Sequence, residues 1–271
     1  MMLRPRNGVD QQLLLEHLQI EPEPRTLSFE QDALGNWIGV ARFEGGARVL
    51  SFVSEVQVAR LPVDRPVEAM EWGPGLPSAP AVDDEVAHWA RGFLPRARAA
   101  PCLEVIAAMT RVIHMGFRYR RRLEHGVQRP AETLALRSGA CRDFAALMVA
   151  GARALGLQAR FASGYVHTSD AANGQRRAGG GHTHAWASVC IPGGGWTDFD
   201  PTSGGVGSEG LIRVAVTDEP DQAVPIHGTY FGGAADFLGM DVEVSVEATP
   251  SSLAPIAREP ESIPRVAWNT A

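Results

Sequence analysis

The chain has 271 residues, of which 45% are hydrophobic, and its formal net charge is −6 at pH 7. This apolar content allows a sizeable core and argues against a disordered chain, while the acidic balance gives no support for nucleic-acid binding. No apolar run is long enough to cross a bilayer, and residues 1–12 lack the apolar core of a signal peptide. We therefore expect a soluble cytoplasmic protein without a membrane partner.

The cysteine and lysine contents add two further constraints. Cys102, Cys141 and Cys190 form an odd and sparse set, so a disulfide framework is not expected. All 25 residues counted as lysine or arginine are arginine, which a codon bias explains. A crosslinking enzyme without lysine would also lack the side-chain amines needed to join itself to other proteins.

The first sixty residues show the alternation of apolar and polar side chains that is typical of strands. The expected strands cover residues 13–22, 26–30, 37–44 and 47–61. Proline, glycine and asparagine between them mark turns. The pattern predicts a small antiparallel β domain over residues 1–61, followed by a proline-rich linker at 62–82.

Helices come first in the second half of the chain, and strands follow. Helices are expected at 83–94 and 101–117 and from Cys141 to Gly156, where glycine provides a left-handed stop. The expected strands cover residues 157–167, 184–191, 195–200, 211–217 and 241–248. This order favours an α+β core over residues 83–248. Residues 249–271, with four prolines, are expected to form a loosely ordered tail.

Cys141 stands at the start of an apolar helix, after Ser138, Gly139 and Ala140. The first turn of a helix has N–H groups without an intrahelical partner, and these stabilise a thiolate. Asp143 has opposing effects there, because its charge suits the helix end but disfavours the thiolate, and Arg142 would offset it. The position predicts a nucleophilic cysteine.

The stretch "GHTHAW" supplies the best base for such a thiol. His184 begins a strand in which Trp186 shares its face and would shield it. A glycine turn leads back to "GWTDFDP", so an acidic residue of that strand falls beside His184 in a hairpin. We favour Asp200, because Pro201 stiffens the chain and Thr202 can bond its carboxylate region, and Asp198 is the alternative.

Four motifs in order, "SGACRDFA", "GLQARFASGY", "HAW" and "GWTDFDPT", resemble the transglutaminase-like core, a branch of the papain-like cysteine enzymes. The resemblance implies that Cys141 is the nucleophile, His184 the base and Asp200 the group that orients the base. The stretches "LRPRNGVDQQLLLEHLQIEP" and "DALGN" resemble the β-rich domain that precedes this core in many bacterial members. That domain usually has a further first strand, whose absence here predicts an unpaired sheet edge or a missing upstream piece.

These features predict an acyl-transfer enzyme that acts on amides of a protein or peptide substrate through a thioester, without a metal or cofactor. The Cys141 N–H would bind the oxyanion, and a second donor is not visible. Hydrolysis and transamidation are not separated. Tyr165 is expected to line the site or pack beneath it. The alternatives are a non-catalytic scaffold of the same fold and a metal site; the residues of that metal site would be Cys141, His182, His184 and Cys190.

Overall fold

The computed structural model describes residues 1–61, 82–95, 101–122, 124–167, 183–207 and 209–248. Strands β1 to β4 are Gln11–Glu21, Thr26–Gln31, Trp37–Arg42 and Ser51–Arg60. The helices are α1 (Asp84–Arg91), α2 (Cys102–Gly116), α3 (Pro130–Leu136) and α4 (Cys141–Ala154). The remaining strands are β5 (Arg118–Tyr119), β6 (Ser138–Gly139), β7 (Ala159–Val166), β8 (His184–Ile191), β9 (Gly195–Asp200), β10 (Gly205–Val206) and β11 (Leu211–Thr217).

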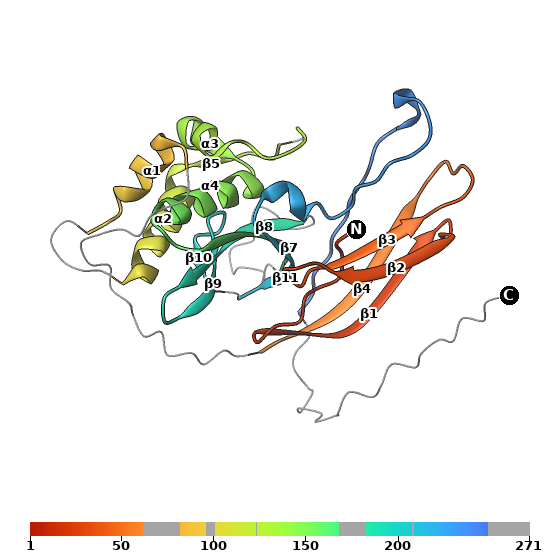
Figure 1. Ribbon diagram of the computed structural model, residues 1–271, viewed down its shortest axis with the longest axis horizontal. Coiled ribbons are helices and arrows are strands. Elements are labelled where there is room, and N and C mark those ends of the chain that lie inside the picture. The colour runs from red at the N-terminus through yellow and green to blue at the C-terminus, as the bar shows by residue number, and fades with distance from the viewer. Residues whose placement is uncertain (62–81, 96–100, 123, 168–182, 208, 249–271) are drawn as a thin grey trace.

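The core is an antiparallel five-stranded sheet in the order β10-β9-β8-β7-β11. Small side chains on one face of β8, such as Ala185 and Ala187, pack with α4 in the main hydrophobic cluster. Because alternate residues of a strand point to opposite faces, this leaves His184 and Trp186 on the other face. Figure 1 shows the four helices gathered on one side of this sheet. The α+β core predicted from the sequence is confirmed.

Helix α4 is the central helix of the core. It ends at Ala154, and Gly156 follows with φ +80°, as the sequence predicts. Gly151 lies so close to Met109 and Trp89 that a Cβ there would meet both side chains. Glycine therefore lets α1 and α2 approach α4 closely. Within the described residues, no helix is both long and apolar enough to cross a membrane.

The N-terminal β region, residues 1–61, consists of two antiparallel pairs, β1 with β4 and β2 with β3. An unpaired edge was expected here, but Met1 pairs with Gly39 of β3. The Met1 ammonium donates to the Gly39 carbonyl at 2.8 Å, and the Gly39 N–H donates to the Met1 carbonyl at 2.9 Å. The edge of β3 therefore has a partner at this point.

Two side-chain amides of the N-terminal β region bind the outer edge of the core sheet. The Gln11 amide accepts from the N–H of Arg213 at 2.9 Å and donates to its carbonyl at 2.8 Å. Asn36 bonds both backbone groups of Val216 in the same way. Both amides are completely buried. They replace a neighbouring strand along β11 and satisfy backbone groups that would otherwise be left unpaired.

We expect Gln11→Ala to lower the free energy of unfolding by about 1–3 kcal/mol, because the Arg213 N–H and carbonyl lose their partner. Gln12→Ala is the matched control, since Gln12 is the exposed neighbour on the same strand and should change stability by less than about 0.5 kcal/mol. Urea denaturation of both variants measures the difference. Equal effects would show that the buried amide does not hold the edge.

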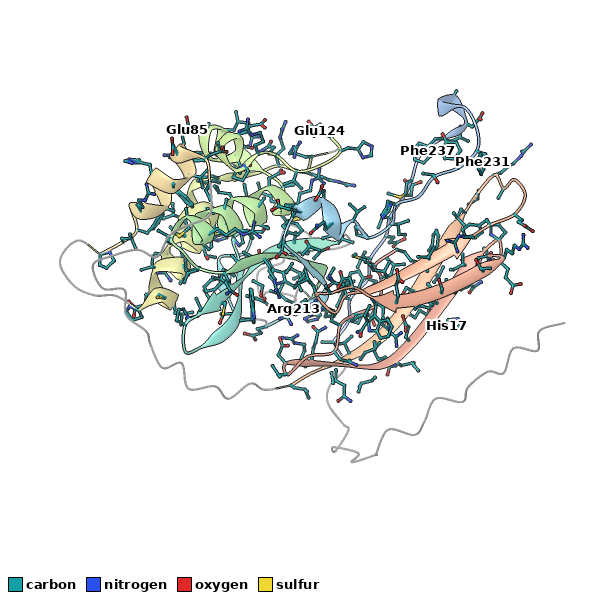
Figure 2. All side chains as sticks on the ribbon, viewed as in Figure 1. His17, Glu85, Glu124, Arg213, Phe231 and Phe237 are labelled. Carbon is teal, nitrogen blue, oxygen red and sulfur yellow. The ribbon has the colours of Figure 1, made fainter. Side chains whose placement is uncertain are left out.

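Part of the sequence prediction fails after β11. The strand expected at 241–248 does not form; those residues have no regular structure and are mostly exposed. They belong to an arm, residues 224–248, that carries strongly exposed aromatic side chains, including Phe231 and Phe237 (Figure 2). Alternating valines alone do not make a strand without a partner edge. The tail at 249–271 and nearly all of the linker lie outside the described residues.

Candidate active site

Cys141 is half-buried at the first position of α4. The chain enters the helix through β6, which pairs in parallel with β5. At Gly139 a Cβ would lie 2.8 Å from the Cβ of Asp143, too close for any other residue without a shift. Glycine before the cysteine therefore permits the tight entry that puts the thiol at the helix end, where N–H groups lack intrahelical partners.

Asp143 fixes this helix end and is fully buried. Its carboxylate accepts the N–H groups of Ala140 and Gln128, both at 2.8 Å. It also pairs with Arg122, whose Nη1 lies 2.7 Å from Oδ1. Arg142, expected to offset this charge, instead donates to backbone carbonyls. The compensating cation is therefore Arg122, which the sequence analysis did not identify.

His184, the first residue of β8, and Asp200, the last residue of β9, form a buried pair at the open end of the β8–β9 hairpin. His184 Nε2 lies 3.0 Å from Asp200 Oδ2. The Asp200 carboxylate also accepts the backbone N–H of Thr202 at 2.9 Å and the hydroxyl of Ser203 at 2.6 Å. The expected contribution of Thr202 thus comes from its backbone, and Ser203 supplies the side-chain bond. These contacts fix the carboxylate in one orientation toward the imidazole.

The environment of His184 favours an imidazolium. Burial lowers its pKa, but the interactions with Asp200 and Cys141 outweigh burial and raise the pKa to about 10. For Asp200, burial raises the pKa, but the bond to His184 is the main cause of a net lowering. Nε2 is held by Asp200, while Nδ1 has no hydrogen-bond partner among the described residues. Nδ1 is therefore the nitrogen free to exchange a proton with Cys141.

These pKa directions set the pH range in which the pair stabilises the fold. The raised pKa of His184 gives a stabilisation that is complete below about pH 6.5 and is lost as the pH rises toward 10. The lowered pKa of Asp200 gives a stabilisation that is present above about pH 4 and is lost in more acidic solution. The pair is fully effective between these limits, at mildly acidic pH.

Asp198, the alternative to Asp200, lies on the same face of β9 but has a different partner. Its Oδ2 is 2.5 Å from Arg213 Nη2. Arg213 also pairs with Asp10 at 3.0 Å, which connects the core sheet to the N-terminal β region (Figure 2). The structure thus brings Asp200, and not Asp198, to the histidine.

The two predicted site-lining residues have different surroundings. Trp186 is fully buried, and its ring stacks on His184 with centroids 6.0 Å apart. Tyr165, expected to line the site or pack beneath it, donates its hydroxyl to the Leu3 carbonyl at 3.2 Å. Burial there raises the pKa of Tyr165 to about 12. The hydroxyl of Tyr165 therefore contacts the N-terminal segment. Gly164 is the register partner of His184, so strand alternation puts the Tyr165 side chain on the face of the sheet opposite to theirs.

Sequence reasoning missed Tyr119 of β5. Its half-buried ring packs edge-on against Phe144 of α4. Burial and the nearby Cys141 charge raise the pKa of its hydroxyl. Tyr119 is therefore a neighbour of the thiol. A two-residue parallel strand leaves no periodicity in the sequence, and the run "RYRRR" was the only available signal.

Of the residues considered for a metal site, Cys141 and His184 lie close together, and Cys190 does not join them. Within the part of the chain that the structure describes, no three histidine, cysteine or acidic side chains are grouped as ligands. Cys190 lies near the other end of β8 from His184 and pairs in register with Trp196. His182 lies outside the described residues.

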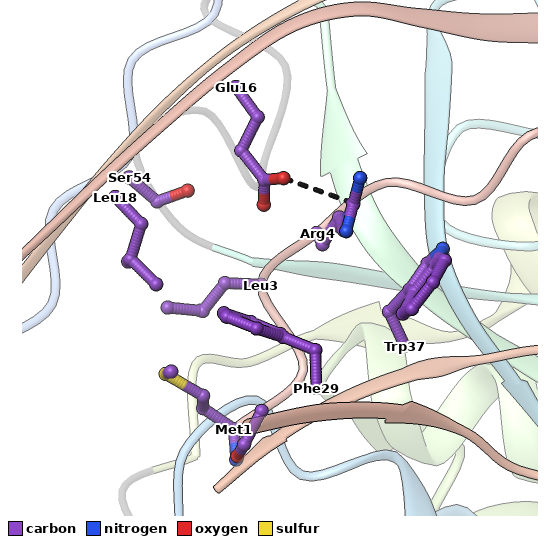
Figure 3. Close-up of a pocket in the computed structure, with 9 residues that line it drawn as sticks. Met1, Leu3, Arg4, Glu16, Leu18, Phe29, Trp37 and Ser54 are labelled. Atoms are coloured by element: carbon purple, nitrogen blue, oxygen red, sulfur yellow. Dashed lines mark hydrogen bonds and ion pairs between the residues drawn. The ribbon is translucent and has the colours of Figure 1, made fainter. Parts of the chain in front are cut away.

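Two hollows elsewhere do not offer comparable chemistry. One, of about 10 Å³, lies in the N-terminal β region beside Arg4, which stacks on Trp37 and pairs with Glu16 (Figure 3). It has room for one water at most. The other, of about 460 Å³, lies at the starts of α1 and α3 and is lined mainly by Asp83, Asp84, Glu85, Arg129 and Glu132. Neither contains a cysteine or histidine.

Comparisons with known proteins agree with this geometry. Residues 89–201 match the transglutaminase-like superfamily, and residues 1–59 match the bacterial transglutaminase-like N-terminal region. An uncharacterised protein of Mycobacterium tuberculosis (strain ATCC 25618 / H37Rv) is 30% identical, over 92% of this chain and 85% of the relative. An uncharacterised protein of Mycobacterium leprae (strain TN) is 35% identical in a match that covers 40% of this chain and 37% of the relative. The chain belongs to the transglutaminase-like superfamily.

A solved structure has the same fold. It is a protein of Cytophaga hutchinsonii, provisionally described as a cysteine protease, with a TM-score of 0.59 and 20% sequence identity. The match covers 82% of this chain and 76% of the other. The sequence prediction of the family and of the fold is therefore confirmed.

Proposed function

We propose that the protein is a cysteine-dependent acyl-transfer enzyme that acts on amide bonds. The observation that carries this proposal is the buried His184–Asp200 pair at 3.0 Å, with Nδ1 of the histidine left free beside Cys141 at the start of α4. A nucleophile, a base and a group that orients the base are the three parts that such chemistry requires.

In the proposed reaction the Cys141 thiolate attacks the carbonyl carbon of the amide. The His184 imidazolium, held at Nε2 by Asp200, donates the Nδ1 proton to the leaving nitrogen, and ammonia or an amine departs. The thioester then reacts with water or an amine; Nδ1 takes the proton of that nucleophile, and the thiolate leaves. Water gives hydrolysis, and an amine gives transamidation.

The oxyanion formed in each half-reaction requires hydrogen-bond donors. The Ala140 N–H is occupied by Asp143, whereas the Cys141 N–H, at the first position of α4, has no intrahelical partner. We assign the Cys141 N–H as one donor, and a donor of this kind contributes about 3–4 kcal/mol in comparable sites.

The first test is the rate of Cys141 alkylation by iodoacetamide between pH 5 and 9, followed for each cysteine by mass spectrometry. If a thiolate–imidazolium pair forms, Cys141 reacts rapidly near pH 6.5, where ordinary thiols are mostly protonated. His184→Ala should lower that rate at least about 10-fold, because the thiolate loses its cation. Cys190 is the internal control. Labelling of Cys141 no faster than Cys190 would remove the chemical basis of the proposal.

The second test separates an enzyme from a scaffold. An activated ester, p-nitrophenyl acetate, should acylate the protein with a burst of one p-nitrophenolate per chain. Cys141→Ala should abolish the burst and leave the fold intact, as judged by circular dichroism. A chain that gives no burst but keeps its thermal unfolding transition would favour the scaffold alternative.

A further inference from the structure

Positive charge is concentrated around the nucleophile. Residues 118–143 contain seven arginines and three acidic residues, an excess of four positive charges in a chain whose net charge is −6. The remainder of the chain is correspondingly acidic. Because the chain has no lysine, the use of arginine is not informative in itself, and the position of the charges is the relevant observation.

The β5–β6 pair brings these arginines to Cys141. In its register Arg118 lies opposite Ser138, and Tyr119 lies opposite Gly139. The Arg120 N–H donates to the Gly139 carbonyl at 2.8 Å. Gly139 precedes the nucleophile by two residues, so it lies within about 8 Å of it along the chain. The arginine-bearing strand therefore runs beside the thiol.

Three of the seven arginines have structural partners. Nη2 of Arg129, the residue before α3, lies 3.4 Å from Asp83 Oδ1. Arg122 pairs with Asp143 and lies 3.7 Å from a carboxylate oxygen of Glu124. Arg142 donates to the backbone carbonyls of Arg122 and Glu124. The side chains of Arg122 and Arg142 therefore help to build the loop that follows β5.

Four others form what we call the arginine cluster: Arg118, Arg120, Arg121 and Arg137. All four are exposed, and among the described residues none has a carboxylate within ion-pair distance. Four unpaired like charges repel one another and raise the local potential beside the thiol. This is the charge pattern of a surface that attracts anions.

Arg137 adds an independent observation. It is the only non-glycine residue with a positive φ, +46°, in the part of the chain that the structure describes. This conformation costs an ordinary residue about 1 kcal/mol or more, and glycine or asparagine would adopt it more easily. Arg137 is the C-cap of α3, where a left-handed residue commonly ends a helix. The chain thus keeps an arginine at a position where its backbone favours another residue.

We propose that the arginine cluster binds the carboxylates of an acidic peptide segment that flanks the amide attacked by Cys141. The inference rests on the proposed function, because that function requires an amide-bearing substrate. Guanidinium groups suit carboxylates, which they bind with two parallel hydrogen bonds. Aspartate or glutamate on either side of the reacting amide would therefore direct the substrate to the thiol.

The potential at the thiol can be measured without knowing the substrate. Iodoacetate and iodoacetamide attack the same thiolate, but only iodoacetate is negatively charged. The rate of alkylation of Cys141 by iodoacetate, divided by its rate with iodoacetamide, therefore reports the local potential. This ratio does not depend on how much thiolate is present. We expect Arg118→Gln/Arg120→Gln/Arg121→Gln to lower this ratio at least about threefold at low salt, and the effect should shrink as the salt concentration rises.

The matched control is Arg42→Gln/Arg48→Gln/Arg91→Gln. These three arginines are also exposed and lie on β3, in the loop after it and at the end of α1. The control variant loses the same net charge and should keep the wild-type ratio. If both triple variants lower the ratio equally, the effect comes from net charge and the proposal is wrong.

Binding is then measured by fluorescence anisotropy on the Cys141→Ala chain, which cannot be acylated at the site. The probe is a labelled ten-residue peptide with one central glutamine flanked by glutamates, compared with the same peptide in which glutamines replace the glutamates. We expect the acidic peptide to bind at least about tenfold more tightly than the neutral peptide. The same chain with Arg118→Gln/Arg120→Gln/Arg121→Gln added, the cluster variant, should lose this preference. No preference, or a preference kept by the cluster variant, would overturn the proposal.

Two further outcomes complete the test. A single-stranded oligonucleotide that binds through the cluster as tightly as the acidic peptide would show a general polyanion surface and contradict a peptide site. Failure of the proposed function would appear separately, as slow alkylation of Cys141 by both reagents, while the rate ratio and peptide binding would still report on the cluster.

Discussion

Asp200→Asn is expected to lower the rate constant for acylation by p-nitrophenyl acetate by about 10²–10⁴-fold, the range of a misplaced base. The Thr202 N–H donates to Oδ1 of Asp200 and therefore selects the carbonyl oxygen of an asparagine at that position. The amide nitrogen then occupies the Oδ2 position and donates to His184 Nε2. A neutral imidazole in that state carries its proton on Nδ1 and cannot accept the proton of the thiol.

Asp198→Asn is the matched control for this variant. It makes the same change two residues away on the same face of β9, but its carboxylate contacts Arg213 and not His184. We expect it to retain the wild-type pH dependence of Cys141 alkylation, whereas Asp200→Asn moves that dependence toward the pH range of an ordinary thiol. Nitrogen-15 NMR of the histidine ring would show the altered tautomer directly. Equal rates for Asp200→Asn and wild type would contradict the role assigned to Asp200.

Much of the fold was predictable because its signals are local. The long strands follow from alternation, and α4 follows from its apolar face and from the stop at Gly156. The glycine turn between β8 and β9 predicts a hairpin, and the hairpin places an acidic residue beside His184. Pairs that are close in sequence or joined by a short turn are within reach of this reasoning.

The elements that were missed are short. Helix α3 has seven residues, and β5, β6 and β10 have two each, which is too few for a periodic pattern. The strand expected at 241–248 shows the reverse error, because alternation was present but no neighbouring edge pairs with it. Strand formation requires a partner, and a single sequence does not show one.

The charge partners around the site were also out of reach. The pairing of Arg122 with Asp143 spans 21 residues, and that of Arg213 with Asp10 spans 203. Such pairs depend on how whole elements pack, so neighbouring residues such as Arg142 are the only partners that sequence reasoning can suggest. The choice between Asp200 and Asp198 also depends on such a pair, because Arg213 of β11 forms an ion pair with Asp198.

Arg213→Met is expected to lower the free energy of unfolding by about 3–5 kcal/mol at pH 7, as is typical when one partner of a buried ion pair is removed. Two carboxylates lose their cation: Asp198 and Asp10 are 2% and 8% exposed. Burial lowers the pKa of the Arg213 guanidinium, but the charge of Asp198 is the largest cause of a net increase, so the group stays charged in the folded protein. Methionine retains much of the side-chain volume but supplies no charge.

The pH dependence of this effect follows from Asp10. Burial raises the pKa of Asp10, but its bond to Arg213 is the main cause of a net lowering. In wild type this carboxylate stabilises the fold above about pH 4, and the stabilisation disappears in acid. Without Arg213 the burial remains, so the pKa of Asp10 rises. At neutral pH the Asp10 carboxylate, having lost this partner, then destabilises the folded state. Urea denaturation at pH 7 and pH 4 should therefore show a smaller difference between variant and wild type at pH 4.

The double variant Arg213→Met/Asp198→Asn isolates the buried pair. It removes both the cation and its closest anion, so we expect it to recover about 1–3 kcal/mol of the loss caused by Arg213→Met. Because Arg213 joins Asp198 on β9 to Asp10 of the N-terminal β region, its removal should also loosen the strand that carries Asp200 and reduce Cys141 alkylation at pH 6.5 by a few fold. A stable Arg213→Met protein with unchanged stability at pH 7 would show that the two carboxylates do not depend on this arginine, and that the N-terminal β region does not support the site through it.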